Sequence, residues 1–149
     1  MSLCFDFSDD QKMMKEAIVT FCKEEISPLV EKAEEEQSFP LELYPKMAEM
    51  GFLGICFEEK YGGLGLDKVT QCILAEELGK TCAGIAKGVA AHVDLGSLPI
   101  AKFGTEAQKE KYLVPSIANS PSNGFLLDGG TLRVSSIVGV TTFPVTSFT

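Results

Sequence analysis

Residues 83–103 form the segment that most constrains how this chain can fold. The segment is nearly uncharged and places apolar or small side chains at helical spacing, among them Ile85, Val89 and Leu98. A helix that is apolar on most sides must be buried inside its own domain or against a partner. The chain therefore needs further helices, or a second molecule, to cover this one.

Helix signals recur along the chain up to residue 118. Ser8 with Gln11 and Thr105 with Gln108 have capping-box spacing, and apolar residues follow at helical intervals. We expect helices from Ser8 to the interruption at Ser27-Pro28, from there through Glu36, from Phe39 to Gly51, from Asp67 onward, over 83–103, and from Thr105 to about Ala118. The prediction is an all-α up-and-down bundle of five or six helices.

The composition changes at Asn119. Residues 119–149 contain only Asp128 and Arg133 as charges, and residues 132–143 have high β propensity. We therefore predict two parts, a helical domain over 1–118 and a short β-like or disordered tail over 119–149.

Charge and cysteine content exclude several classes of protein. The net charge is −8 and Arg133 is the only arginine, which opposes nucleic-acid binding. The five cysteines contain no CxxC pair, so we predict reduced thiols in a cytoplasmic protein. No apolar run is long enough for a transmembrane segment, and the N-terminus lacks a signal-peptide pattern. His92 is the only histidine and has no ligand-spaced partner, so we predict no metal site.

Two motifs suggest chemistry but have simpler interpretations. Tyr61-Gly-Gly-Leu-Gly65 lacks the Lys-Ser/Thr of a P-loop, so a tight turn is favoured over a phosphate site. Glu76 and Glu77 are adjacent, and adjacent helical side chains point about 100° apart. The pair is therefore predicted to serve the surface or helix packing, and no catalytic residue is assigned.

Several fragments resemble the acyl-CoA dehydrogenase family. They occur in family order over about residues 5–117: 21–28, Phe39-Pro40, 46–55, Tyr61-Gly-Gly-Leu-Gly65, Glu76-Glu-Leu78 and Phe103-Gly-Thr-Glu-Ala-Gln-Lys109. Glu58 departs from the pattern, because family members often have proline there. The chain thus resembles the N-terminal helical domain of these enzymes.

The resemblance implies α,β-dehydrogenation of an acyl-CoA, with a carboxylate base removing the α-proton and FAD accepting a hydride. It also implies that one wall of the acyl-tail pocket is formed by Gly88, Ala91, His92 and Leu95, which share a helix face. Packing of this stripe against another helix is an equal alternative.

The tail does not match the continuation that the resemblance implies. Residues 120–149 contain no glutamate for the base and no Thr-Glu-Pro flavin segment. We therefore expect the isolated chain to bind no FAD and to be inactive. Three hypotheses remain: a component of a flavin-dependent enzyme, a stand-alone helical interaction or acyl-lipid-binding module, and a remnant without function. A homo-oligomer is expected, because an uncovered apolar helix tends to find a partner.

Overall fold

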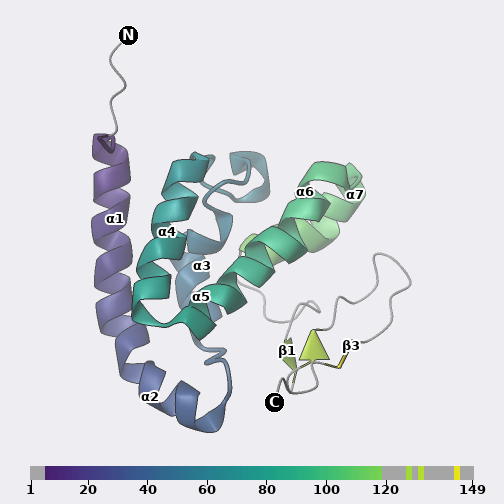
Figure 1. Cartoon of the computed structure of the whole chain (residues 1–149). Helices are drawn as coiled ribbons and strands as arrows, with labels where there is room; N and C mark the ends of the chain where they lie inside the picture. The colour runs from purple at the N-terminus through teal and green to yellow at the C-terminus, as the bar shows by residue number, and fades with distance from the viewer. Residues whose placement is uncertain (1–5, 119–126, 129–130, 133–142, 145–149) are drawn as a thin grey trace.

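The computed structural model describes residues 6–118, 127–128, 131–132 and 143–144. Residues 9–36 form one continuous helical stretch, and residues 83–103 form another (Figure 1). The first consists of α1 (Asp9–Phe21), η1 (Cys22–Ile26) and α2 (Ser27–Glu36), and the second of α5 (Ala83–Ala90), η4 (Ala91–Ser97) and α6 (Leu98–Phe103). The other helical elements are α3 (Leu43–Glu49), η2 (Phe52–Gly54), η3 (Glu59–Tyr61), α4 (Lys68–Thr81), α7 (Glu106–Gln108), η5 (Lys109–Leu113) and α8 (Val114–Ile117).

The long helices alternate in direction along the chain. In Figure 1, α1 descends from the N-terminus, α3 returns, α4 descends beside α1, and α5 turns back from the lower end of α4. The α1–α4 and α4–α5 interfaces are the most extensive in the bundle. The predicted all-α up-and-down bundle is confirmed.

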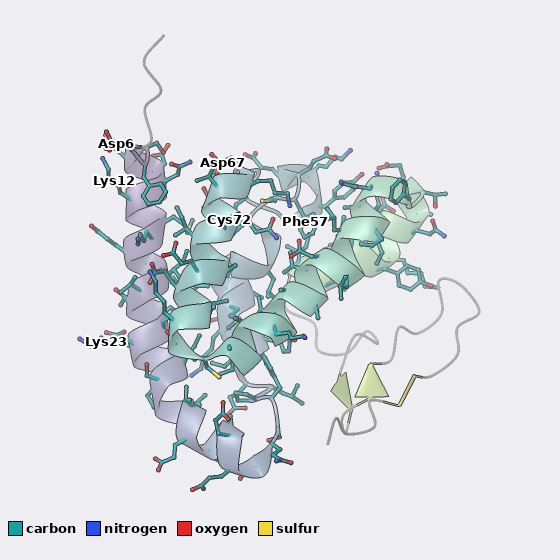
Figure 2. The ribbon with its side chains drawn as sticks, in the orientation of Figure 1. Asp6, Lys12, Lys23, Phe57, Asp67 and Cys72 are labelled. Carbon is teal, nitrogen blue, oxygen red and sulfur yellow. The ribbon has the colours of Figure 1, made fainter. Side chains whose placement is uncertain are left out.

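Side chains cap the N-termini of the helices at the residues where the sequence predicts that helices begin. The Ser8 hydroxyl accepts from the amide of Gln11, whose side chain accepts from the amide of Ser8. Asp67 accepts from the amide of Thr70 at 2.8 Å, so it caps α4. Gln11 also donates to Asp67 at 2.8 Å, which joins the starts of α1 and α4 at the upper end of the bundle (Figure 2).

Three prolines are accommodated by π-helical turns, and this changes one expectation. The chain stays helical through Ser27-Pro28, where the sequence predicts an interruption. The amide of Ser27 bonds to the carbonyl of Cys22, five residues back. A proline inside an α-helix clashes with the carbonyl four residues earlier, and the wider turn η1 precedes this one. The turns η4 and η5 precede Pro99 and Pro115 in the same way.

The core lies where α1, α3, α4 and α5 face one another. Phe21 of α1 and Phe52 of η2 meet edge to face, with ring centroids 5.3 Å apart. The largest fully buried side chains are Phe52, Ile18, Ile26, Leu43, Met47, Ile55, Leu78 and Leu113. These residues come from six elements and one connecting segment, so the core requires the whole region from α1 to η5.

Beyond residue 118 the structure describes three two-residue strands. They are β1 (Leu127–Asp128), β2 (Thr131–Leu132) and β3 (Phe143–Pro144), paired antiparallel in the order β1-β2-β3. The other residues of the tail prediction, including most of 132–143, lie outside the described residues.

Candidate functional site

The stripe predicted as an acyl-pocket wall begins at Gly88, which is tightly packed. A Cβ added at Gly88 would lie 2.7 Å from Cε2 of Phe39. Phe39 in turn stacks on Tyr44, with ring centroids 4.9 Å apart. The Tyr44 hydroxyl donates to the Gly88 carbonyl at 3.4 Å. Glycine is therefore required at this position by the neighbouring aromatic rings.

His92 lies on the same side of the helix and is also covered. Its ring is 5.2 Å from that of Tyr44, and Nε2 is 2.9 Å from the carbonyl oxygen of Ser116. Burial lowers the pKa of His92, and the hydrogen bond to Ser116 opposes this effect in part. Burial also raises the pKa of Tyr44 to about 12. His92 is thus a partly buried, hydrogen-bonded residue whose ring is neutral near pH 7.

The remaining two stripe residues are more open. Ala91 is partly exposed, and Leu95 is 68% exposed. The stripe therefore divides into a covered half, Gly88 and His92, and an open half, Ala91 and Leu95. Leu95 is the most accessible of the four, whereas Ala91 and His92 are each partly exposed.

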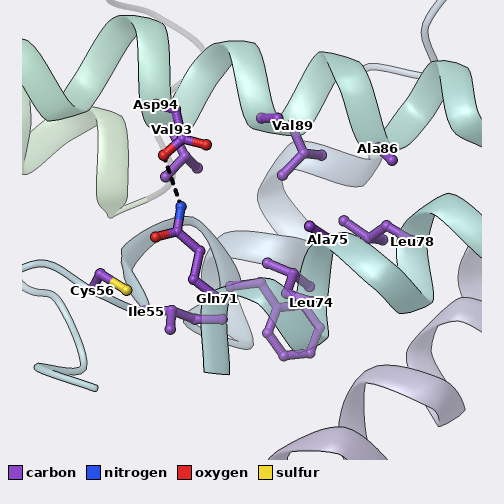
Figure 3. Close-up of a pocket in the computed structure, with 12 residues that line it drawn as sticks. Ile55, Cys56, Gln71, Leu74, Ala75, Leu78, Ala86, Val89, Val93 and Asp94 are labelled. Carbon is purple, nitrogen blue, oxygen red and sulfur yellow. Dashed lines mark hydrogen bonds between the residues drawn. The ribbon is translucent and has the colours of Figure 1, made fainter. Parts of the chain in front are cut away.

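A small hollow lies between α4 and the α5–η4 stretch (Figure 3). Its volume is ≈ 30 Å³, which is room for about one or two water molecules. Its lining is mostly apolar, and a hydrogen bond of 2.9 Å from Gln71 to Asp94 crosses its edge. None of the four stripe residues lines this hollow, and the hollow is too small for an acyl tail.

The glycine-rich segment 61–65 is a turn whose amides are occupied. The amides of Gly62, Gly63, Leu64 and Gly65 donate to backbone carbonyls of Glu59, Glu58, Gly54 and Phe57, respectively. Gly62 and Gly65 have φ of 90° and 63°, a conformation that favours glycine. A phosphate cradle needs free amides pointing at the ligand. The backbone amides of this segment are therefore not available to the phosphates of FAD.

Glu76 and Glu77 form ion pairs with lysines. Glu77 lies 2.9 Å from Lys80 and 3.4 Å from Lys15 of α1, while Glu76 lies 2.6 Å from Lys80. The hydrogen bond from Lys80 is the main reason that the pKa of Glu77 is lowered. A general base needs a pKa close to the working pH. Glu77 instead joins α1 to α4, so the pair is a packing feature.

Other candidate chemistry is limited within the described residues. No group of three or more His, Cys, Asp or Glu side chains there could hold a metal ion. Cys22, Cys56, Cys72 and Cys82 are free thiols, and burial raises the pKa of Cys22 and Cys56. Within residues 6–118, no helix is long and apolar enough to cross a membrane.

Sequence reasoning missed the aromatic pair that covers the stripe. Phe39 and Tyr44 lie 49 and 44 residues before Gly88 in the chain. In the sequence, Phe39-Pro40 indicates only the start of a helix and one fragment of the family resemblance. The lack of a side chain at Gly88, within an apolar helical segment, is the available signal that a large group approaches closely.

The comparisons with known proteins agree with this architecture. A family model described as "Acyl-CoA dehydrogenase, N-terminal domain" matches residues 8–120. A probable acyl-CoA dehydrogenase of Bacillus subtilis is 37% identical over 121 residues, which cover 81% of this chain and 32% of that protein. The mitochondrial isovaleryl-CoA dehydrogenase of Arabidopsis thaliana is 36% identical over 141 residues, which cover 93% of this chain and 34% of that protein.

Solved structures give the same result. Butyryl-CoA dehydrogenase from Megasphaera elsdenii superposes with a TM-score of 0.72 at 33% identity, over 83% of this chain and 35% of that one. An acyl-CoA dehydrogenase complexed with FAD from Bacillus anthracis superposes with a TM-score of 0.69 at 38% identity, over 76% of this chain and 19% of that one.

The chain spans about a third of the length of the curated relatives it matches first. The helical bundle, the order of the sequence fragments and the matched residues 8–120 all correspond to one domain of those proteins. The chain belongs to the acyl-CoA dehydrogenase family, as its N-terminal helical domain.

Proposed function

We propose that this chain is the N-terminal domain of a flavin-dependent enzyme that dehydrogenates an acyl-CoA thioester between its α and β carbons. The observation that supports this most strongly is the family match over 8–120, together with a bundle of the same fold. When bound, FAD supplies the acceptor for the hydride. The flavin site and the base would come from residues other than those described here.

Within that enzyme we propose that the open half of the stripe, Ala91 and Leu95, contacts the acyl tail. Both side chains are apolar and accessible on a helix that the bundle covers on its other side. Gly88 and His92 fix the position of this wall in the bundle. Gly88 packs against Phe39, and His92 contacts Tyr44 and Ser116. All four residues assigned from the sequence thus keep a role, two as the surface of the wall and two as its support.

The division of the chain into a domain over 1–118 and a divergent tail over 119–149 also stays a proposal. The alignment with the Arabidopsis relative covers 93% of this chain, so it includes part of residues 119–149. That alignment weighs against a tail wholly unrelated to the family. The acyl-CoA substrate and a homo-oligomer are proposed on the same family basis, and a cytoplasmic location stays a proposal from the cysteine pattern.

A chimera tests the proposed function. Residues 8–118 of this chain would replace the matched segment of the Megasphaera elsdenii enzyme. We expect a protein that retains FAD through gel filtration and oxidises acyl-CoA with a dye as acceptor. A folded chimera that retains no flavin, or retains flavin without any acyl-CoA oxidation, would contradict the proposal.

The substitution Ala91→Phe in this chimera tests the wall. Each buried methylene contributes about 0.8 kcal/mol and overpacking costs about 1–3 kcal/mol, so a ring at position 91 should reduce affinity for long acyl chains more than for short ones. A uniform loss across all chain lengths would show that Ala91 packs against protein.

The alternative is a stand-alone module that binds a partner helix or an acyl lipid without catalysis. The exposed Leu95 and Phe103 favour this reading, because they leave apolar surface uncovered on the segment 83–103. A colourless, well-folded oligomer of the isolated chain, combined with an inactive chimera, would support this alternative.

A further inference from the structure

A second hollow, between α2 and the segment 38–42, is much larger than the one beside α4. Its volume is ≈ 230 Å³, which exceeds the cavity of about 150 Å³ that holds a benzene ring. The ring of Phe39 is held by stacking on Tyr44, so this part of the wall is fixed by the bundle. The apolar lining of this 29–42 hollow comes from both segments: Leu29, Ala33, Phe39, Pro40 and Leu41.

The rim of the 29–42 hollow is acidic. Residues 29–42 contain five glutamates and one lysine, Lys32. Lys32 lies 3.9 Å from Glu36, whereas Glu42 takes part in none of the ion pairs among the described residues. Both glutamates line the hollow. Its shape and charge therefore suit an apolar group that is carried beside positive charge.

The chain itself presents such a group at the C-terminal end of α6. Phe103 is 85% exposed, more than any other large apolar side chain in the part of the chain that the structure describes. The segment 102–111 contains three lysines and two glutamates. Lys102 and Lys111 are exposed and form no ion pair with a described residue. A phenyl ring thus projects here beside uncompensated positive charge.

The two surfaces cannot meet within one molecule. In Figure 1, α2 lies at the lower end of the bundle and α6 near its upper end. The ring of one copy can enter only the hollow of another copy. Such a contact joins different patches on the two molecules, so it is heterologous, and a pair formed in this way keeps one free ring and one free hollow.

We propose that Phe103 of one copy of this chain enters the 29–42 hollow of a second copy, with the lysines of segment 102–111 beside its acidic rim. This head-to-tail contact goes beyond the proposed function and does not depend on it. The contact is small and centred on one side chain, so the association is weak and increases with protein concentration. Because each pair keeps a free ring and a free hollow, species larger than a dimer form as the concentration rises.

The test uses two variants of the full chain, each lacking one side of the contact. Phe103→Ser removes the ring and keeps the hollow, whereas Ala33→Phe fills the hollow and keeps Phe103. Sedimentation velocity over a range of concentrations measures the association. We expect each variant alone to associate at least about tenfold more weakly than the parent, which corresponds to the burial of one phenyl ring. An equimolar mixture of the two should form a heterodimer and no larger species, because only one ring and one hollow remain.

Glu42→Lys is a second variant of the hollow, in an exposed position where the change does not disturb the core. It should weaken the association, and more strongly at low than at high ionic strength. Met13→Ser is the matched control for Phe103→Ser, because Met13 is 65% exposed on α1, outside the hollow. This control should associate like the parent.

Three results would each overturn the inference. The first is a parent chain that stays monomeric at every concentration, and the second is an equimolar mixture that stays monomeric. The third is unchanged association in Ala33→Phe and Glu42→Lys. A symmetric contact between the 83–103 segments of two copies would give this third result, because the hollow would take no part in it.

Discussion

The contact between Gly88 and Phe39 leads to a prediction at the scale of single residues. A Cβ at position 88 would lie 2.7 and 2.8 Å from two ring carbons of Phe39, and stacking on Tyr44 keeps that ring from moving aside. Gly88→Ala should therefore lower the free energy of unfolding by about 1–3 kcal/mol, the usual cost of overpacking. Urea unfolding followed by circular dichroism measures this change.

Gly79→Ala is the control for that substitution. Gly79 also lies in a helix, and a Cβ there would meet nothing within 4 Å. Alanine should stabilise this helix by about 0.5–1 kcal/mol, because it loses less backbone freedom on folding. Equal effects at both positions would show that Phe39 yields easily to a larger residue.

The lowered pKa of His92 predicts how the free energy of unfolding depends on pH. Its pKa is lowered from 6.5 by burial, so the unfolded chain takes up a proton at a higher pH than the folded chain. Neutral His92 contributes its full share to the free energy of unfolding above about pH 6.5. This contribution decreases as the pH falls from there toward the lower pKa of His92 in the folded state. Because His92 is the only histidine, His92→Gln should remove this pH dependence from the melting temperature. Parallel pH profiles for the two proteins would contradict the assignment.

At this scale the sequence identifies candidate positions but not the residues that contact them. The family resemblance singles out Gly88 and His92, and helical spacing places them on one face. Phe39, Tyr44 and Ser116 could not be assigned to them, because these contacts join residues 24 to 49 positions apart. Local periodicity contains no information on which face of a helix meets a distant segment.

At the scale of elements, Glu77 joins α1 to α4. Its carboxylate is nearly buried and contacts Lys15 of α1 at 3.4 Å and Lys80 at 2.9 Å. Glu77→Gln should lower the free energy of unfolding by about 1 kcal/mol, because it removes charge from a partly buried hydrogen-bonded pair. Thermal unfolding near neutral pH measures this loss.

Glu76→Gln provides the comparison, because Glu76 is half exposed and contacts only Lys80 of its own helix. An exposed pair of this kind contributes about 0.5 kcal/mol or less. If the two variants unfold at the same temperature, the contact with Lys15 adds nothing to the α1–α4 interface.

The element boundaries show what sequence patterns can and cannot predict. Both capping boxes and the Asp67 cap were predicted, since each depends on residues three positions apart. The continuity of the helix through Pro28 was not predicted. The same local sequence fits a proline that follows a π-helical turn and a proline at which a helix ends. Packing of α1 and α2 against other elements decides between the two.

For the whole molecule, we expect the isolated chain to bind no FAD stoichiometrically and to oxidise no acyl-CoA. The amides of the 61–65 turn are occupied by backbone carbonyls, and the Glu77 carboxylate is engaged by two lysines. The turn therefore offers no phosphate cradle, and Glu77 is not free to act as a base. Flavin absorbance that coelutes with the purified chain on gel filtration would refute this expectation.

The isolated chain should also self-associate through the segment 83–103. Its inner face is buried, but Leu95 is 68% and Phe103 is 85% exposed, and the relatives have a further two-thirds of their length that this chain does not match. Uncovered apolar side chains of this size favour association in water. Light scattering after gel filtration should show a dimer or larger species that becomes monomeric when Leu95 and Phe103 are both changed to Glu.

Met13→Glu is the matched control for self-association, because Met13 is 65% exposed on α1 rather than on this segment. If it dissociates the oligomer equally, the interface lies elsewhere or the effect comes from added charge alone. A monomeric parent chain at high concentration, with no binding of an apolar dye, would show that the bundle needs no cover over 83–103. The apolar character of this segment would then be explained by its inner face alone, where the bundle already buries Ile85, Val89 and Val93.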